Sequence, residues 1–494
     1  MLRIRLSPTL GSSTVLALPV EGDTGGLLPI EPELPAGLTE PAGRFLDDIE
    51  HTGAAGTVQA LPRPGATPRR LLLVGVGDGD EAGWRAAGAG LSRVAQKDER
   101  LTVALGPADP GALRGLVEGL LLASYRFRMG ADDPDSAPKL REVKVLVSDP
   151  DRYAEGLAAA QVTAEATYLA RDLTNWPSQE KTPAWFANRV TRAAARQPAL
   201  SVSVLGPASL HDEGFGGILA VGGGSDRGPR LVELAYRPRG AKRHVVLIGK
   251  GITFDSGGIC IKPRDGMKLM RKDMGGAAAV IAATLGAAGL GLPIRVTTLA
   301  PLAENMISGN AYRPGDVVRH YGGKTSEITD TDAEGRVVLA DALAYATRRL
   351  KPDLIVDLAT LTGANAVALG KRTAALYSGS DELAEQLAQA ATAAGERVWR
   401  MPLVDDYVEA LDSEVADFVN STEIGAGSVV AALYLREFVG AARDRWAHLD
   451  MSAPSWSDST DAELVKGATG WGVRTLLRWL ADLSTEHVRP PAIR

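Results

Sequence analysis

Cysteine is almost absent from this sequence, because Cys260 is the one thiol among 494 residues. A single cysteine excludes an intrachain disulfide and is typical of proteins from reducing compartments. Long apolar runs are absent as well. No stretch approaches the roughly 20 apolar residues that a membrane-spanning helix needs, and the start of the chain lacks the apolar core of a signal peptide. We therefore expect a cytoplasmic protein that has no membrane partner.

Concentrated positive charge is also missing. The chain has 54 lysines and arginines against 60 aspartates and glutamates, a net charge of −6, and no basic block stands out. This balance argues against nucleic acid as a partner. The composition is 45% hydrophobic and 23% charged, which is typical of globular proteins and excludes disorder of the whole chain. A chain of this length is too long for one simple core, so two or three domains are expected.

The short signatures of several enzyme classes do not occur. The sequence contains no HExxH, no GxSxG, no P-loop and no CxxC, and its six histidines are isolated from one another. Cys260 has no histidine nearby in the sequence, so a packed small side chain is the better interpretation than a nucleophile.

Apolar runs alternate with helical patterns along most of the chain, which indicates an α/β fold. We expect a smaller N-terminal α/β domain over 1–151 and a connecting helix and loop over 152–176. The larger catalytic domain then covers 177–494, with a mixed, mostly parallel sheet flanked by helices. The strands expected in the larger domain cover 200–206, 231–238, 244–251, 294–300, 353–359 and 445–451. The helices expected there cover 184–197, 273–289, 335–350, 381–395 and 470–483.

One acidic stretch stands directly before an apolar helical run. It reads ITDTDAEGRVVLADAL from Ile328 and contains Asp330, Asp332 and Glu334 within five positions. Burying such charges costs several kcal/mol each unless a cation neutralises them. In an extended segment, residues two apart point the same way, so Asp332 and Glu334 can reach one point. Asp330 is expected to lie outside that site. A solvated acidic loop is the alternative.

Further charged residues follow an apolar strand in HVVLIGKGITFDSGGICIKP. Lys250 comes just after the strand, Asp255 precedes two glycines, Lys262 follows, and Asp273 begins a predicted helix. Asp273 could simply cap that helix. Together with the acidic stretch, four carboxylates match the charge of two divalent cations, which take oxygen ligands readily. Lys250 can bind a metal only when neutral, while Lys262 can stay charged and face the substrate. The alternative for either lysine is a surface position.

These residues resemble a known family. The segments IGKGITFDSGG, MKLMRKDMGGAA and TDTDAEGRVVLADAL together are similar to the leucyl aminopeptidases, the cytosolic aminopeptidases that use two metal ions. The similarity continues in ENMISGNAYRPGDVV, VDLATLTGA, AALYLREFVG and WAHLDMSAPSW and covers roughly 160–480. Three long segments in the same order make the resemblance specific. At one position the sequence departs from the family, which commonly has asparagine where Asp330 stands.

The resemblance implies a role for each matching residue. It implies that Asp255 and Glu334 bridge two divalent metal ions, Mn or Zn. Asp332 then completes the more exchangeable site, and Lys250 and Asp273 complete the tighter one. The remaining implied roles are catalysis by Lys262 and Arg336, with bicarbonate held at Arg336, and contact with the substrate side chain by Met270, Thr360 and Gly363.

The activity implied by the resemblance is hydrolysis of the N-terminal residue from peptides, with leucine and other apolar residues preferred. A metal-activated hydroxide would attack the peptide carbonyl, and the subunits would form a homohexamer. Two alternatives stay open. One is a two-metal hydrolase of another ester or amide. The other is a DNA-binding protein with incidental peptidase activity, as some family members bind DNA, although no basic face supports it here.

Overall fold

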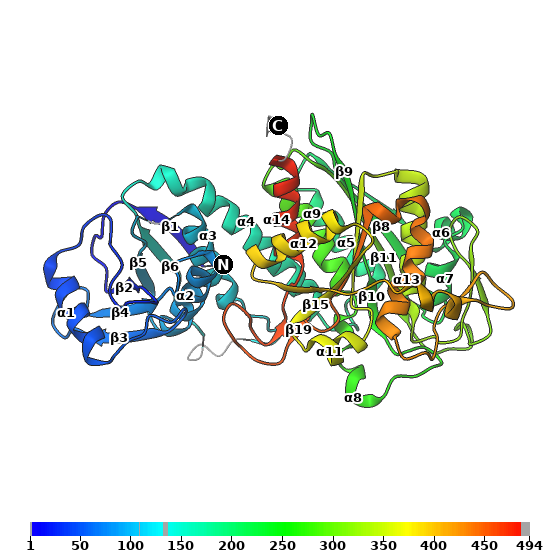
Figure 1. The fold of residues 1–494 in the computed structure, drawn as a ribbon, viewed down its shortest axis with the longest axis horizontal. Coiled ribbons are helices and arrows are strands. Elements are labelled where there is room, and N and C mark those ends of the chain that lie inside the picture. The colour runs from blue at the N-terminus through cyan, green and yellow to red at the C-terminus, as the bar shows by residue number, and fades with distance from the viewer. Residues whose placement is uncertain (1, 108, 132–136, 486–494) are drawn as a thin grey trace. The chain divides into compact units, whose positions relative to one another are not determined.

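The structure is a computed structural model that describes residues 2–107, 109–131 and 137–485. The chain forms two compact units, which are drawn in Figure 1. The N-terminal unit comprises Met1–Tyr168 and Asp458–Lys466, and the C-terminal unit comprises Leu169–Ser457 and Gly467–Arg494. The division falls within one long helix, α4 (Pro150–Asn175), inside the segment predicted to connect the domains. The return of 458–466 to the N-terminal unit was not expected from the sequence.

The N-terminal unit is built on a six-stranded sheet in the order β1-β6-β5-β2-β4-β3. All neighbouring strands are parallel except β3 and β4, which are antiparallel. The strands are β1 (Arg3–Ser7), β2 (Val15–Val20), β3 (Val58–Pro62), β4 (Arg70–Gly75), β5 (Arg100–Ala104) and β6 (Glu142–Leu146). The helices are α1 (Ala36–Asp48), α2 (Glu81–Val94), α3 (Pro110–Ser124) and the first part of α4.

Alternating side chains of these strands enter two separate apolar cores. Val15, Leu72 and Val103 pack with α2, α3 and α4 on one face of the sheet. Leu16 and Leu71 pack with α1 on the other face. Because every residue of β2 is buried, both faces of the central strand contribute to the cores, as is usual for a parallel sheet between helices.

The C-terminal unit contains a larger mixed sheet in the order β16-β15-β18-β14-β9-β11-β8-β7, with β10 paired to β11. Strands β18, β14, β9 and β11 run parallel to one another, while β15, β8 and β7 supply antiparallel pairs. The strands of this sheet are β7 (Leu200–Leu205), β8 (Arg230–Tyr236), β9 (His244–Gly249), β10 (Gly251–Asp255), β11 (Arg295–Asn305), β14 (Leu354–Ala359), β15 (Thr373–Ser378), β16 (Arg397–Arg400) and β18 (Trp446–Asp450). The short strands outside it are β12 (Val317–Arg319), β13 (Thr325–Glu327), β17 (Phe418–Val419), β19 (Trp456–Ser457) and β20 (Gly467–Ala468).

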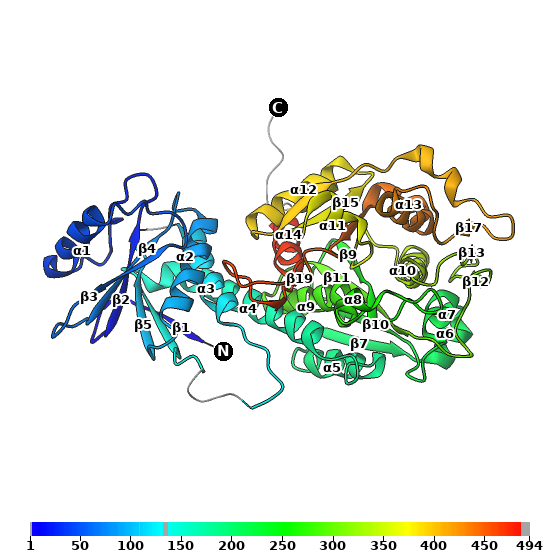
Figure 2. The same ribbon diagram turned by 90° about the horizontal axis from the view of Figure 1, so that it is seen from below.

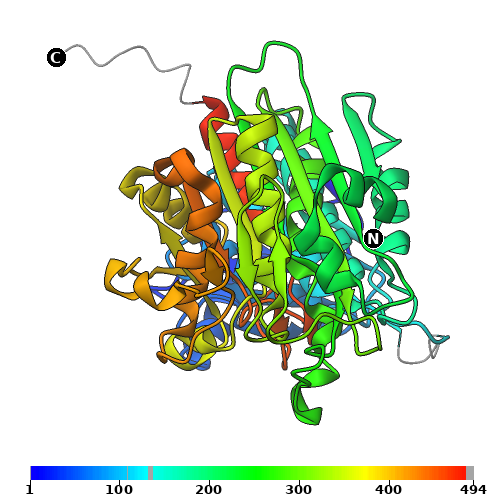
Figure 3. The same ribbon diagram turned by 90° about the vertical axis from the view of Figure 1, so that its right-hand side faces the viewer.

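Helices cover both faces of this sheet, as Figure 2 shows. One face packs against α6, α7, α10 and α13 in a continuous apolar core, and Figure 3 looks onto that face. Helix α9 lies on the other face, in contact with α5 and α14, and α14 in turn contacts α12. The helices are α5 (Pro183–Ala194), α6 (Pro207–Glu213), α7 (Gly216–Gly222), α8 (Arg264–Met267), α9 (Gly275–Gly289), α10 (Glu334–Tyr345), α11 (Ala364–Leu369), α12 (Asp381–Ala393), α13 (Gly427–Val439) and α14 (Val473–Thr485). Shorter helical turns are η1 (Met270–Lys272), η2 (Ala346–Leu350), η3 (Asp405–Tyr407), η4 (Glu409–Leu411) and η5 (Gly440–Arg445).

The predicted fold class is confirmed: both units are α/β, and the larger sheet is mixed, mostly parallel and flanked by helices. Several elements differ from expectation. The predicted helix at 273–289 begins at Gly275, and the predicted helix at 335–350 changes pitch at Ala346. Helices α1 and α13 were missed. Among the described residues, no helix combines the length and the apolar character needed to span a membrane.

Candidate metal centre

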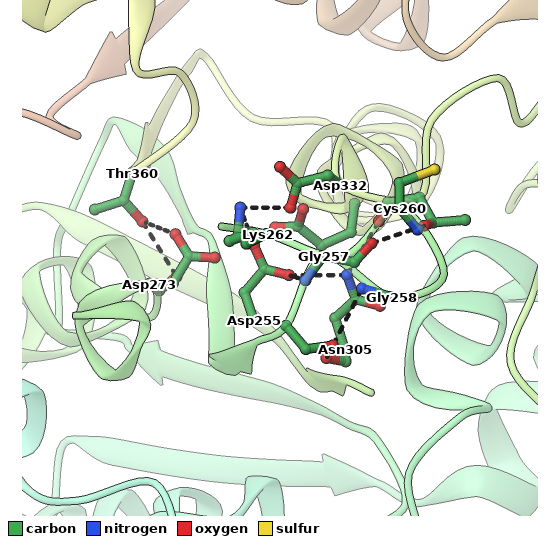
Figure 4. A network of polar contacts seen from close by, with 12 residues as sticks. Asp255, Gly257, Gly258, Cys260, Lys262, Asp273, Asn305, Asp332 and Thr360 are labelled. Carbon is green, nitrogen blue, oxygen red and sulfur yellow. Dashed lines mark hydrogen bonds and ion pairs between the residues drawn. The ribbon is translucent and has the colours of Figure 1, made fainter. Parts of the chain in front are cut away.

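The parallel strands of the C-terminal unit bring polar residues to their carboxyl ends, where α/β sheets usually bind ligands. Lys250 follows the last residue of β9, and Thr360 follows the last residue of β14. Asp255 is the last residue of β10, opposite Asn305 at the end of β11. Figure 4 shows Asn305 beside Asp255 and Thr360 beside Asp273.

The Asp255 side chain is fixed by hydrogen bonds to one of its two oxygens. Its Oδ1 accepts hydrogen bonds from Asn305 Nδ2 at 2.8 Å and from the Gly257 backbone N–H at 2.9 Å. Its Oδ2 lies 2.8 Å from Lys262 Nζ. The carboxylate is 1% exposed, so its orientation is determined by these three partners.

Asp273 does not cap a helix. It follows η1, while α9 begins two residues later at Gly275 and has no side-chain cap. Instead Asp273 Oδ1 accepts a hydrogen bond from Thr360 Oγ1 at 2.7 Å, which joins the turn before α9 to the end of β14. The capping alternative is therefore wrong, and the side chain is free to face Asp255 and Glu334.

The acidic stretch has a different shape from the one expected. Asp332 lies in a turn and Glu334 is the first residue of α10, so the extended segment assumed from the sequence is wrong. The turn and helix still bring Glu334 to the site, because oxygens of Asp255, Asp273 and Glu334 lie within 4.8 Å of one another. Asp330 accepts a hydrogen bond from the Asp332 N–H at 2.8 Å and lies outside that group.

Two lysines separate the four carboxylates. Lys250 Nζ lies 2.9 Å from Asp273 Oδ2 and 2.7 Å from Glu334 Oε1. Lys262 Nζ lies 2.5 Å from Asp332 Oδ1, in addition to its contact with Asp255. Burial lowers the pKa of each lysine, but the surrounding carboxylates outweigh it and raise the pKa above the usual value. Both side chains are therefore ammonium ions in this arrangement.

The cluster keeps an excess of negative charge, because four carboxylates meet only two lysines. Burial and the repulsion by Asp273 raise the pKa of Glu334 to about 7, against the opposing effect of Lys250. Burial also raises the pKa of the three aspartates. Glu334 Oε1 and Asp273 Oδ2 face Lys250, and Asp332 Oδ1 faces Lys262, so the two lysines are shared among four carboxylates. Buried carboxylate oxygens with surplus negative charge fit divalent cations.

Two glycines allow this close packing. A side chain at Gly335 would place its Cβ 2.7 Å from Lys250 Nζ, so only glycine lets Lys250 lie against the start of α10. Gly257 has φ +85°, and a Cβ there would lie 2.8 Å from Asp332 Oδ1. Substitution at Gly257 is therefore strained by its backbone conformation as well as by its neighbours.

The other predicted site residues are Arg336, Met270, Gly363 and Thr360, and among them the hydrogen bonds to the cluster come from Thr360. Arg336 is buried in the first turn of α10 and donates from Nη1 to the Asn420 carbonyl at 2.8 Å, while its Nε has no hydrogen bond. Met270 begins η1 and is half-buried, and Gly363 is exposed before α11. Thr360 is the member in direct contact, since its carbonyl accepts a hydrogen bond from Lys250 Nζ at 3.1 Å.

Several residues that hold the site together were not singled out from the sequence. Thr331 Oγ1 donates to the Gly257 carbonyl at 2.7 Å and accepts from the Cys260 N–H at 2.8 Å. Buried Asp450, at the end of β18, accepts hydrogen bonds from Thr362 and Asn365 and so fixes the loop after β14. Asp450 comes at the end of an apolar run, and this sequence pattern could have indicated a polar residue at the ligand-binding edge of the sheet.

Comparisons with known proteins agree with this arrangement. The catalytic domain of the cytosol aminopeptidase family matches residues 168–477, and the N-terminal domain of that family matches residues 23–129. This chain belongs to the cytosol aminopeptidase family. It is therefore an aminopeptidase, which is a peptide hydrolase, and the resemblance read from the sequence is confirmed.

Relatives within the family cover nearly the whole chain. A probable cytosol aminopeptidase of Roseiflexus castenholzii is 43% identical over 457 residues, which is 88% of this chain and 93% of the relative. One from Leifsonia xyli subsp. xyli is 42% identical and covers 96% of both chains. Among solved structures, the bottromycin maturation enzyme BotP in complex with Mn is 41% identical, with a TM-score of 0.83 over 96% of this chain and 100% of BotP. The Mn in that relative supports a divalent metal cofactor for the family.

Proposed function

We propose that this cytosol aminopeptidase removes leucine and other apolar N-terminal residues from peptides with the help of two divalent metal ions, Mn or Zn. The observation that carries the proposal is the surplus of buried negative charge at the ends of β9, β10 and β14. Asp255, Asp273 and Glu334 are each less than 5% exposed, and oxygens of all three converge within 4.8 Å. An isolated group of this kind is unstable without cations.

The resemblance to the family supports the proposed ligand set, and the convergence of Asp255, Asp273 and Glu334 agrees with it. Asp255 and Glu334 would hold both ions, Asp332 would complete one site, and Lys250 with Asp273 would complete the other. Lys250 would take this role only as a neutral amine, because an ammonium ion has no lone pair to donate. Two bound divalent ions lower the pKa of a water molecule and polarise a carbonyl group.

Lys262 is proposed to stabilise the oxyanion that develops on the substrate. Its ammonium group is kept protonated by Asp255 and Asp332, and it is less buried than Lys250, with 17% of its side chain exposed. A fixed cation beside the reacting carbonyl acts mainly on the transition state. All four carboxylates are used as ligands, so a base must come from elsewhere. Arg336, whose buried Nε has no partner, is proposed to hold a bicarbonate ion for this purpose.

The substrate side chain is proposed to lie near the N-terminal end of α9. A Cβ added to Gly275 would meet Thr360 Cγ2 at 3.7 Å and Met451 Cε at 3.6 Å, so apolar atoms line this part of the site. Met270 and Gly363 complete the proposed contact set. Such a lining favours leucine and other apolar residues over charged ones.

The test of this function compares leucinamide with N-acetyl-leucinamide under the same metal-loaded conditions. The free α-amine is the feature that distinguishes the first residue of a peptide, so leucinamide should be hydrolysed and the acetylated compound should be inert. A phosphate monoester serves as a third substrate and should not be hydrolysed. Efficient cleavage of the acetylated compound, or internal cuts in a long peptide, would replace the aminopeptidase mechanism proposed here with that of another amidase.

The proposal extends to assembly and location. We propose a cytoplasmic homohexamer that acts on peptides and does not require nucleic acid. Membership of the cytosol aminopeptidase family supports this assignment, together with exposed apolar side chains of the C-terminal unit such as Ile261 and Trp399. Sedimentation velocity measures the oligomeric state directly, and a monomer at micromolar concentration would contradict the assembly.

A further inference from the structure

A second hollow lies in the C-terminal unit, beyond the end of α10 that is remote from the metal centre. Its volume is about 440 Å³, which is within the range of small-molecule sites. Three segments line it: residues 321–324, residues 344–352 after α10, and residues 437–445 after α13. Glu334 and Leu350 are the two ends of one helical run, so roughly 24 Å of helix separates this hollow from the metal centre.

The lining of the hollow is strongly basic. Lys324, Arg348, Lys351 and Arg445 contribute positive charge, and Glu437 is the one acidic side chain in the lining. Glu437 is already neutralised, because Arg443 Nη2 contacts its two oxygens at 2.7 and 2.8 Å. In an acidic protein of net charge −6, such a concentration of cations stands out.

Three of these cations have no carboxylate partner. Over the part of the chain that the structure describes, no ion pair joins Arg348, Lys351 or Arg445 to an acidic side chain. Arg445 Nη1 donates to the Pro352 carbonyl at 3.1 Å, which holds the guanidinium group in place. Arg348 and Lys351 are exposed and remain available to a ligand.

The hollow also has an apolar and aromatic part. Phe438 and Val439 are buried beside it, and Tyr321 is half-buried. Lys324 Nζ lies 5.7 Å from the centre of the Phe438 ring and donates to the Glu437 carbonyl at 2.6 Å. A ligand in this place therefore meets cations at the rim and rings on the wall.

The end of a helix alone does not account for this arrangement. Cations commonly gather at helix C-termini, where they interact with the helix dipole, and Arg348 and Lys351 are in such a position. Lys324 and Arg445 come from other segments, however, and line the same space. The last turn of the helix is also already capped by a backbone hydrogen bond from Lys351 N–H to the Ala346 carbonyl at 3.0 Å.

We propose that this hollow binds a small organic anion, with a phosphate, phosphonate or carboxylate group held by Arg348, Lys351 and Arg445 and an apolar or aromatic part against Phe438 and Tyr321. The volume suits one small molecule, and the cations surround a hollow instead of forming a stripe that could follow a duplex. The site does not use the metal centre, so it stands independently of the proposed catalytic mechanism.

Hydrogen–deuterium exchange of the full, metal-loaded chain with phenylphosphonate locates the binding site without any substitution. The proposal predicts slower exchange in peptides that cover 344–352 and 437–445 when the ligand is present. Protection confined to peptides around 255–262 and 330–336 would place all binding at the metal centre and overturn the proposal.

A matched pair of variants then separates specific binding from loss of net charge. Arg348→Gln combined with Lys351→Gln should weaken the phenylphosphonate binding measured by calorimetry at least tenfold. Arg192→Gln combined with Arg196→Gln removes the same charge from exposed positions in the last turn of α5 and just after its end, and should leave the affinity unchanged. Equal affinity in the wild type and the first variant, or an equal loss in both variants, contradicts the proposal.

Three further ligands test the chemistry of the site. Phenol tests the aromatic part alone and should bind at least tenfold more weakly than phenylphosphonate. Inorganic phosphate tests the anion alone, and its binding should also weaken in the Arg348→Gln, Lys351→Gln variant. Ala441→Trp fills the hollow while keeping all its charges and should abolish phenylphosphonate binding. A duplex DNA that protects 344–352 when phenylphosphonate does not would replace the small anion with nucleic acid.

Discussion

The two units of this chain share an architecture but differ in how they accommodate buried charge. In the N-terminal unit, Arg85 contacts Glu81 at 2.8 Å and Glu118 at 3.2 Å between α2 and α3. Asp98 is likewise paired with two arginines, Arg69 and Arg70. The Arg85 group therefore carries a net charge of −1, and the Asp98 group carries +1. In the C-terminal unit, the cluster at the strand ends keeps two more carboxylates than lysines.

This difference indicates what each group of charges is for. Arg85 joins two helices, and 20% of the Glu81 side chain is exposed, so water can solvate the one surplus charge of that group. The cluster at the strand ends carries two surplus charges, and three of its carboxylates converge within 4.8 Å, so it is costly by itself and becomes favourable when cations bind. The size of the buried surplus therefore distinguishes the binding site from the structural ion pair.

The largest expected effect comes from neutralising one carboxylate in each unit. Glu334→Gln should lower kcat/KM for leucinamide by about 10⁴-fold, the size found for essential members of other catalytic groups. Glu118→Gln removes an equally buried carboxylate from the N-terminal unit and should leave kcat/KM within about twofold. Initial rates at a temperature where both variants are folded provide the measurement. A similar loss in both variants would mean that buried charge, and not its surplus, determines activity.

Removing the cation from the Arg85 group should affect stability instead of catalysis. Arg85→Met leaves Glu118 buried without a cation, and losing one partner of a buried pair costs about 3–5 kcal/mol. Arg44→Met on the surface of α1, where the side chain is 76% exposed and 3.9 Å from Glu40, should cost less than about 1 kcal/mol. Chemical denaturation followed by circular dichroism measures both free energies of unfolding. Unchanged stability of Arg85→Met would contradict the structural role of the group.

Lys262→Met should show that the two lysines of the cluster differ. Because Lys262 is assigned to the transition state, kcat should fall by about 10²–10³-fold while the metal content is kept. Lys250→Met should lower the metal content as well, since Lys250 is assigned as a ligand. Elemental analysis of both variants, together with kcat, decides between these roles. Loss of metal in Lys262→Met with retained metal in Lys250→Met would exchange the two assignments.

The smallest expected effects are on how the free energy of unfolding depends on pH, and they come from two buried histidines. Burial and nearby Arg295 lower the pKa of His244 to about 4, so its stabilising contribution is lost as pH falls from about 6.5 to 4. Burial also opposes protonation of His448, but Asp357 outweighs it and raises the pKa, so that contribution is lost as pH rises above about 6.5. Unfolding free energies of His244→Asn and His448→Asn are measured from pH 4 to 8. Their pH dependence should differ from that of the wild type below about pH 6.5 for His244→Asn and above about pH 6.5 for His448→Asn. Parallel curves would show that neither histidine is linked to folding.

Much of the catalytic architecture could be predicted from local patterns. The apolar runs at 244–251 and 353–359 indicate buried parallel strands, and the polar residues after them fall at one edge of the sheet. The structure brings Glu334 to Asp255 and Asp273, while Asp332 contacts Lys262 and lies outside that group of three carboxylates, so the predicted approach of Asp332 and Glu334 to one point stays a prediction. Two acidic residues separated by one position occur both in extended strands and in turns that lead into a helix, so the sequence pattern does not distinguish the two conformations. The packing of α10 against the sheet determines which conformation forms.

Other features could not be predicted because they depend on residues far apart in the sequence. Asn305 orients Asp255 from 50 positions away, and Asp450 fixes Thr362 from 88 positions away. The basic hollow combines three segments, each of which looks like an ordinary solvated charge pattern on its own. Helix α1 was missed because it contains Pro41, which is normally a sign against a helix interior.

The most direct test of the central claim is a measurement of metal binding itself. The wild-type chain is stripped with a chelator and titrated with Mn²⁺ or Zn²⁺ in a calorimeter, with elemental analysis after dialysis. We predict that the wild type and Glu118→Gln each bind two ions per chain. The variant that combines Asp273→Asn with Glu334→Gln should bind markedly fewer ions. Equal uptake by the wild type and by the combined variant would contradict the claim that the surplus of buried carboxylates is a divalent metal site.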